Sequence, residues 1–182
     1  DVAHLLAVHD DAPTLLQVSE PLSLHTARAL LLTDRPADGA DLRAAWRGRE
    51  KDPSAWAALE ARCLARMKRT QEAVALFQSL PGPGTERAAA LADIAAVLSE
   101  TDPGRGRELA ARALAEAPGS PDALAGAAVV AARLGDPEAA RRHAETALRL
   151  APRDPLIRAW AAQFLCREGR HAEAAEVFAG GL

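Results

Sequence analysis

A helix-turn-helix pattern recurs in this sequence about every 34 residues, and its clearest copy spans residues 121–154. In that copy Ser120 can cap a first helix and Asp136 a second, and a proline follows each of them. Proline suits the first position of a helix because the N–H that it lacks would be unpaired there. Gly135 supplies the stop between the two helices. The stretch is therefore predicted to be a helical hairpin.

The same period appears at single positions along most of the chain. The small residue near the start of each second helix falls, in steps of 33, 33, 34 and 34, at Ala40, Ala73, Gly106, Ala140 and Ala174. Aspartate followed by proline recurs where a helix should begin, at residues 52, 102, 136 and 154. Because units that repeat at this length pack against their neighbours, the chain is predicted to be a stack of about five hairpins.

The composition agrees with an all-α fold. Apolar residues make up 49% of the 182 residues, which is enough for a buried core. Alanine dominates them, while Tyr is absent and Phe and Trp number three each. Alanine, leucine, arginine and glutamate all favour helices. The sequence therefore predicts helices in close contact through small side chains rather than a thick aromatic core.

The domain organisation follows from where the repeat begins. Residues 1–19 fit it poorly and are predicted to be an N-terminal capping segment, with an extended arm or half a helix at residues 4–8. Residues 20–182 are predicted to form the repeat domain. Its units span about 20–53, 54–86, 87–120, 121–154 and 155–182.

Helix boundaries within the units follow from caps and breakers. The first unit is predicted to pair helices at 20–33 and 40–49, because Asp34, Pro36 and Gly39 favour a break between them. The helices of the second, third and fifth units are predicted at 53–67 and 71–80, 86–99 and 103–117, and 155–167 and 171–179.

A unit of this length and pattern resembles the tetratricopeptide repeat. The small residues, turn glycine and exit proline of that repeat correspond in the fourth unit to Ala128, Gly135, Ala140, Ala144, Ala147 and Pro152. In the fifth unit they correspond to Ala162, Gly169, Ala174 and Phe178. The turn glycine is replaced in the first three units by Arg35, Lys68 and Thr101. The resemblance implies a right-handed α-solenoid whose concave face, lined by the first helix of each unit, binds extended peptides or helices.

The repeat register then selects candidate protein-binding residues on the concave face. They are Arg62, Arg66, Leu91, Ala95, Val129, Arg133, Trp160, Gln163 and Arg167. An apolar floor with an arginine near one end of three units suits a protein or peptide with apolar anchors and acidic side chains. In a second interpretation the small residues fill space and the arginines form a solvated rim. The sequence leaves both interpretations open.

The last unit suggests a second surface. No amphipathic segment follows residue 179 to cover Leu165, Ala175 and Phe178. A solenoid whose final apolar face is uncovered is predicted either to be a piece of a longer protein or to form a homodimer through its terminal repeats.

Charge and composition exclude several classes of partner. The net charge is −3, with no basic face, so no nucleic-acid binding is predicted. Arginine outnumbers lysine twenty to two, which fits a GC-rich bacterial gene. No apolar run has membrane-spanning length and no signal peptide is visible. Two unpaired cysteines favour the cytoplasm, although a chain that begins at Asp1 leaves room for an upstream signal, anchor or domain.

No reactive constellation is found in the sequence. Cys63 and Cys166 form no CxxC pair, and His4 and His9 are wrongly spaced to stack on one helix face as metal ligands. No nucleophile has a base at an interpretable spacing, and no phosphate-binding loop is present. We therefore expect no catalytic residue, metal or cofactor. The predicted function is a non-catalytic protein–protein interaction scaffold. The alternative is a sensor or oligomerisation arm of a larger regulatory protein or enzyme.

Overall fold

The computed structural model describes residues 2–179, leaving out the side chain of residue 156, and the regular elements in this range are α-helices and one 3-10 helix, η1, joined by turns. The elements are α1 (Val2–Asp11), η1 (Pro13–Gln17), α2 (Glu20–Leu32), α3 (Pro36–Trp46), α4 (Pro53–Arg66), α5 (Thr70–Ser79), α6 (Thr85–Leu98), α7 (Pro103–Glu116), α8 (Pro121–Arg133), α9 (Pro137–Leu150), α10 (Pro155–Arg167) and α11 (His171–Ala179). From α2 onward they form five hairpins, so the predicted all-α stack is confirmed. The expectations that fall on Asp1 and on residues 180–182 lie outside the described residues.

The helix starts are fixed by the predicted caps. The Ser120 hydroxyl accepts a hydrogen bond from the backbone N–H of Ala123 at 3.3 Å, and the Asp136 carboxylate accepts one from Ala139 at 2.9 Å. Each cap satisfies one of the N–H groups that a helix leaves unpaired at its first turn. Because these caps are local, the predicted boundaries of α4 to α11 agree with the structure to within about two residues.

The turn positions correct the register of the first unit. Gly135 has a φ of 76°, in the left-handed region, and Lys68 adopts a φ of 63° at the equivalent turn of the second hairpin. In the first hairpin the residue with positive φ is Asp34, at 59°, rather than the expected Arg35. Asp34 lies 34 positions before Lys68, so the first unit keeps the repeat period.

The second helix of the first hairpin begins earlier than expected. α3 starts at Pro36 and runs through Gly39, which was predicted to be part of a break. Proline is well placed at the first position of a helix. Gly39 lies at a close contact between hairpins, since a Cβ there would lie 3.1 Å from the Cys63 sulfur of α4. The N-terminal segment also differs from the expected arm or half helix, because α1 is helical over ten residues.

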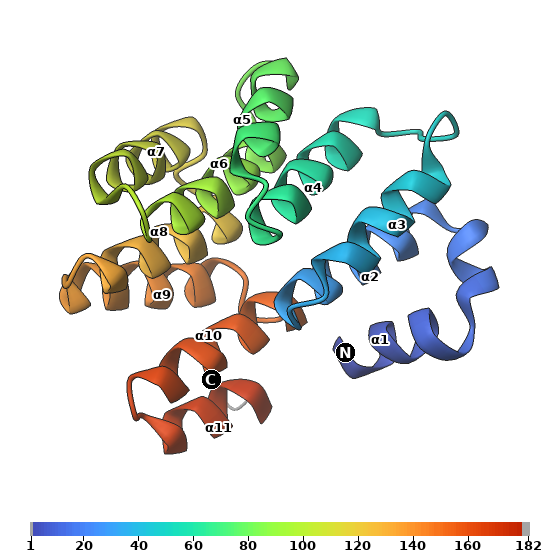
Figure 1. Ribbon diagram of the computed structural model, residues 1–182. Coiled ribbons are helices and arrows are strands. Elements are labelled where there is room, and N and C mark those ends of the chain that lie inside the picture. The colour runs from blue at the N-terminus through green and yellow to red at the C-terminus, as the bar shows by residue number, and fades with distance from the viewer. Residues whose placement is uncertain (1, 180–182) are drawn as a thin grey trace.

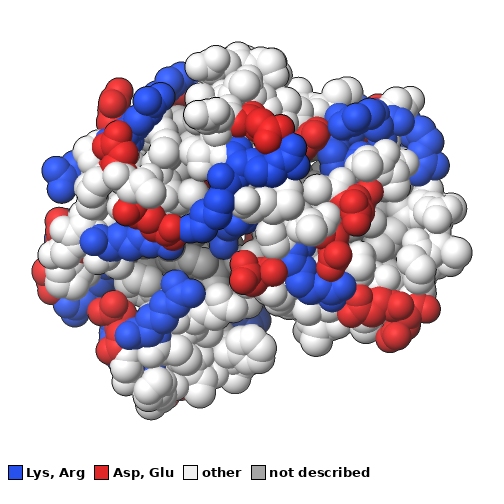
Figure 2. Space-filling model, in the orientation of Figure 1, with Lys and Arg blue, Asp and Glu red and all other residues white. Residues whose placement is uncertain are grey.

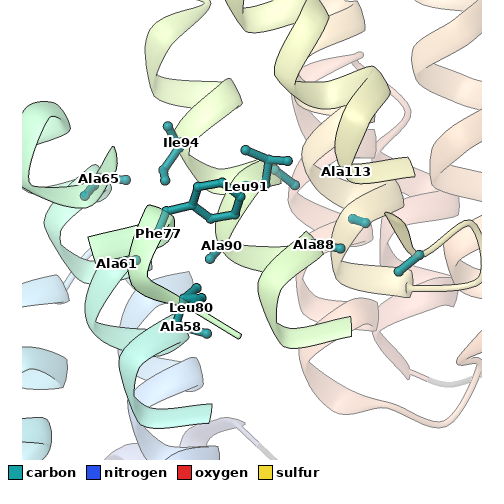
Figure 3. Close-up of a cluster of buried hydrophobic side chains, with 14 residues drawn as sticks. Ala58, Ala61, Ala65, Phe77, Leu80, Ala88, Ala90, Leu91, Ile94 and Ala113 are labelled. Atoms are coloured by element: carbon teal, nitrogen blue, oxygen red, sulfur yellow. The ribbon is translucent and has the colours of Figure 1, made fainter. Parts of the chain in front are cut away.

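The middle of the stack is a tightly packed block. α6 lies between α4 and α8 and also packs against α7, its partner in the third hairpin (Figure 1). Its core consists mostly of alanines around a few larger side chains, and Figure 3 shows the Phe77 ring among Leu91, Ile94 and Ala90. At the α6–α8 crossing, a Cβ built on Gly126 would lie 2.5 Å from the Cβ of Ala92. Small side chains therefore let these helices approach closely, as predicted.

The two ends of the stack contact each other. Besides its neighbours α8 and α9, helix α10 contacts α2 and α1 (Figure 1). The first and fifth hairpins thus meet, and the first helices of all five hairpins surround a common space. The inner surface is a cavity rather than the open groove that the sequence predicted.

Candidate functional site

The cavity enclosed by the stack has a volume of about 560 Å³. Seven of the nine predicted groove residues line it: Arg62, Arg66, Val129, Arg133, Trp160, Gln163 and Arg167. The repeat register therefore brought together side chains from three hairpins that are distant in sequence. Ligand sites in proteins commonly have volumes of roughly 300–1,000 Å³, so the cavity is large enough to be one.

Leu91 and Ala95 do not line the cavity. They are 1% and 0% exposed and lie in the core, because α6 is covered by α4, α7 and α8. The side chains of the third hairpin that do reach the cavity include Asp93 and Ala96 of α6 and Glu100 in the turn after it. Ala96 and Glu100 lie 33 positions before Val129 and Arg133, so the 34-residue register places the third unit one residue out of step.

A network of ion pairs crosses the cavity wall. Arg62 contacts Asp93 at 2.5 Å and Asp122 at 3.0 Å, and Arg66 contacts Asp93 at 2.9 Å. Arg28 reaches Asp122 from the first hairpin at 2.7 Å. The network connects α2, α4, α6 and α8, and so fixes the arrangement of four hairpins. The sequence reasoning missed Arg28, Asp93 and Asp122, although Arg28 lies 34 positions before Arg62 and so occupies the equivalent position of the first unit.

The two most buried members of this network stay charged. Burial by itself would raise the pKa of Asp93, but Arg62 and Arg66 outweigh it and hold that pKa below its ordinary value. Burial would likewise lower the pKa of Arg62, but Asp93 and Asp122 raise it instead. A buried charge is stable only when it is paired in this way. Arg62 and Arg66 are therefore structural members of the wall, with much of their bonding capacity already used.

A second group of charges lies at the carboxyl ends of the first helices. Arg133 contacts Glu100 at 2.9 Å, and Lys68 contacts the same carboxylate. The hydrogen bond from Lys68 lowers the pKa of Glu100, with burial opposing the shift and Arg133 adding to it. Arg167 makes no ion pair within residues 2–179. It is therefore the cavity arginine whose charge remains open to a partner.

The side chains near Arg167 are suited to a contact with a partner. Gln163 is exposed, and Trp160 is partly exposed with its ring stacked on Phe164 at a centroid distance of 5.8 Å. The cavity as a whole has six basic and four acidic lining residues, in a chain whose net charge is −3. Figure 2 shows these two kinds of charge interleaved around the hollow at the centre of this face. The cavity is therefore locally cationic, with an aromatic surface beside its free arginine.

The predicted self-association residues are divided between core and surface. Leu165 is 8% exposed and packs with Ala174 and Val177, so α11 covers it and its predicted exposure is wrong. Ala175 and Phe178 line a groove of about 770 Å³ that also contains side chains of α1 and the end of α2. Phe178 is 65% exposed. This second surface is mainly apolar and is called the terminal groove below.

Within residues 2–179, no three His, Cys, Asp or Glu side chains form a cluster that could hold a metal ion. His9 and Asp10 instead contact each other and Arg35, and the hydrogen bonds from Arg35 and His9 lower the pKa of Asp10 to about 2. None of the helices in that range has both the length and the apolar character needed to cross a membrane.

Comparisons with known proteins agree with the repeat. Residues 131–182 match the family model described as tetratricopeptide repeat. The tetratricopeptide repeat recognised in the sequence is therefore confirmed over this segment. No curated protein sequence matches the chain.

Two solved structures of MamA are similar to the chain. One, "MamA RS-1 ArsTM double mutant", has 18% identity and a TM-score of 0.46, and the match covers 88% of this chain and 90% of that one. The other, "MamA 41-end from Desulfovibrio magneticus RS-1", has the same identity and TM-score, with coverages of 87% and 90%.

Proposed function

We propose that this protein is a non-catalytic interaction scaffold whose cavity binds an extended segment or helix of a partner protein. The tetratricopeptide match supports an interaction role in general. The observation that supports the cavity as the site is the group formed by Trp160, Gln163 and Arg167. It offers an aromatic surface, an exposed amide and an arginine that makes no ion pair with any other residue of 2–179, all at one place on the inner wall.

The chemistry of this group selects the partner. A guanidinium binds carboxylates through paired, charge-assisted hydrogen bonds. The Trp160 ring offers a large apolar contact directly beside it. We therefore expect a segment that combines an apolar or aromatic anchor with a nearby Asp, Glu or terminal carboxylate. Arg62 and Arg66 contribute less to binding, because Asp93 already occupies them.

A peptide selection tests this proposal. The purified protein is panned against a random peptide library, and the enriched peptides are measured by fluorescence anisotropy. We expect Arg167→Glu to raise Kd at least tenfold, because it replaces an attractive charge with a repulsive one. Arg149→Glu is the matched control, since Arg149 is exposed on α9 and does not line the cavity. Equal binding by both variants would place the site elsewhere.

The terminal groove supports a second candidate, a homodimer through the last hairpin. Large exposed apolar side chains around a groove are typical of protein contact sites. Phe178→Glu is expected to abolish a dimer observed by sedimentation velocity, whereas Val18→Glu, at a residue 79% exposed and outside the groove, should leave it intact. A monomer at all concentrations would exclude the homodimer. The alternative role, an arm of a larger regulatory protein or enzyme, would use the same surfaces against other domains.

A further inference from the structure

The fifth hairpin is attached to the stack much more lightly than the others. The third and fourth hairpins are joined by extensive α6–α8 and α7–α8 contacts, whereas α10 makes only sparse contacts with α8 and α9 and with α2 and α1. Its contact with the fourth hairpin is made by apolar side chains: Ile157 packs with Leu124 and Ala147, and Trp160 and Phe164 pack with alanines. Among the residues that the structure describes, this interface shows neither the close backbone approach seen at Gly126 nor an ion pair comparable to those of the inner wall.

The polar contacts of this hairpin hold it together as a unit. Arg158 of α10 donates to the carbonyl oxygens of Val177, at 3.0 Å, and of Phe178, both in α11. Arg170 and Glu173 bond within the hairpin at 2.7 Å. α10 and α11 are therefore bound to each other more firmly than to the rest of the molecule, which is the condition for moving as a rigid body.

The seam between α10 and α2 separates two cavities. Gln163 and Arg167 line both the central cavity and the terminal groove, and so do Leu32 and Thr33 at the end of α2. Empty space of about 560 Å³ lies on one side of the seam and of about 770 Å³ on the other. A contact that is flanked by space on both sides loses little packing when its surfaces part.

We propose that the fifth hairpin, residues 155–179, is a lid that swings about the α9–α10 connection and closes the central cavity by resting on α2. This inference concerns how the site of the proposed function is reached. The lid carries Trp160, Gln163 and Arg167, so opening exposes these side chains and closing brings them onto a bound segment. When the lid rests on α2, the cavity encloses the bound segment. When the lid swings away, the segment can enter or leave.

The lid is tested by a distance measurement that requires no ligand. Spin labels are attached to cysteines introduced at Arg47 and Glu176, both exposed, in a Cys166→Ser background. Cys63 stays unlabelled, because it is 0% exposed and burial raises the pKa of its thiol to about 12. In this background Leu32→Lys places a positive charge in the seam, where Arg167 repels it. We expect the distance between the two labels, measured by double electron–electron resonance, to become longer and its distribution broader.

A matched variant and a milder one complete the experiment. Leu150→Lys makes the same substitution at a residue 49% exposed on α9 and should leave the distribution unchanged. If circular dichroism shows that Leu32→Lys does not fold, Thr33→Lys introduces the same charge at the partly buried edge of the same seam. An unchanged distance in a folded seam variant would overturn the lid. Peptide binding tests the proposed function separately, since a fixed fifth hairpin could still bind a peptide.

Discussion

The interface between the first and second hairpins differs from that between the third and fourth in which helices make its tightest contact. In the first, Trp46 of α3 and Trp56 of α4 stack at a centroid distance of 6.2 Å, and α2 contributes polar residues to the core. In the second, Gly126 and Ala92 bring two backbones together with almost no side chain between them. The period of the repeat is kept in both cases. A degenerate repeat can therefore preserve its geometry with large side chains where a regular one uses small residues.

The aromatic interface depends on a buried carboxylate. Glu20 is 6% exposed and accepts hydrogen bonds from the Trp56 indole at 2.9 Å and from the backbone N–H groups of Lys51 and Asp52. A buried carboxylate is tolerated when several donors satisfy it. Glu20 thus joins the start of α2 to the start of α4 through hydrogen bonds. At the α6–α8 crossing, the helices are joined instead by direct contact of their backbones.

The largest effect is expected from Trp56→Ala. It empties the core of the aromatic interface and removes a donor from Glu20, so the free energy of unfolding should fall by about 3–5 kcal/mol. Urea denaturation followed by circular dichroism measures this loss. A decrease below about 1 kcal/mol would mean that the aromatic pair fills space without holding the two hairpins together.

The second-largest effect is expected in the ion-pair network that joins α2, α4, α6 and α8. Asp93→Asn leaves Arg62 and Arg66 without their shared counter-charge and is expected to cost about 3 kcal/mol at pH 7. Because the pKa of Asp93 lies below its ordinary value of 3.8, its stabilising contribution is present above pH 3.8 and is lost as pH falls through the lower, folded-state pKa. The variant should therefore show a shallower loss of stability on acidification than the wild type in a urea series from pH 7 to pH 2. Parallel curves would contradict this.

The smallest effect is expected at the close crossing. Gly126→Ala would place a methyl group 2.5 Å from the Cβ of Ala92, and overpacking of this kind costs about 1–3 kcal/mol. Gly104→Ala is the control, because Gly104 is also helical but its nearest neighbour is the Asp102 side chain at 3.6 Å. The control should gain up to about 1 kcal/mol from helix propensity. If both substitutions stabilised the protein, the close-packing interpretation of the repeat would be wrong.

Local features of the fold were predictable because local chemistry determines them. Caps such as Ser120 and Asp136 fix where helices begin, and they are visible in the sequence as a polar residue before a proline. Gly39 was wrongly predicted to be part of a break between two helices. Its role depends on Cys63, 24 positions away, and a breaker cannot be distinguished from a packing glycine without that neighbour.

The site was predictable in part. The repeat register placed Arg66, Val129 and Trp160 on a common wall, because equivalent positions of stacked units face the same way. It gave no information on how strongly the stack curves. The contact between α10 and α2, and the pairing of Arg28 with Asp122 across 94 positions, arise from small rotations summed over all five hairpins. Burial of Arg62 follows from that curvature and was therefore missed.

The pairing of Arg28 with Asp122 also has a consequence for the order of folding. In an open stack every contact is between near neighbours in sequence, so structure can spread outward from any hairpin, and the ends exchange their amide hydrogens first. Here the first hairpin gains a bond to a residue 94 positions away. Contacts of such large sequence separation form late, because the chain must first be ordered between them. The first hairpin should thus be among the last parts to reach its final protection from exchange during refolding, although it is synthesised before the other four hairpins.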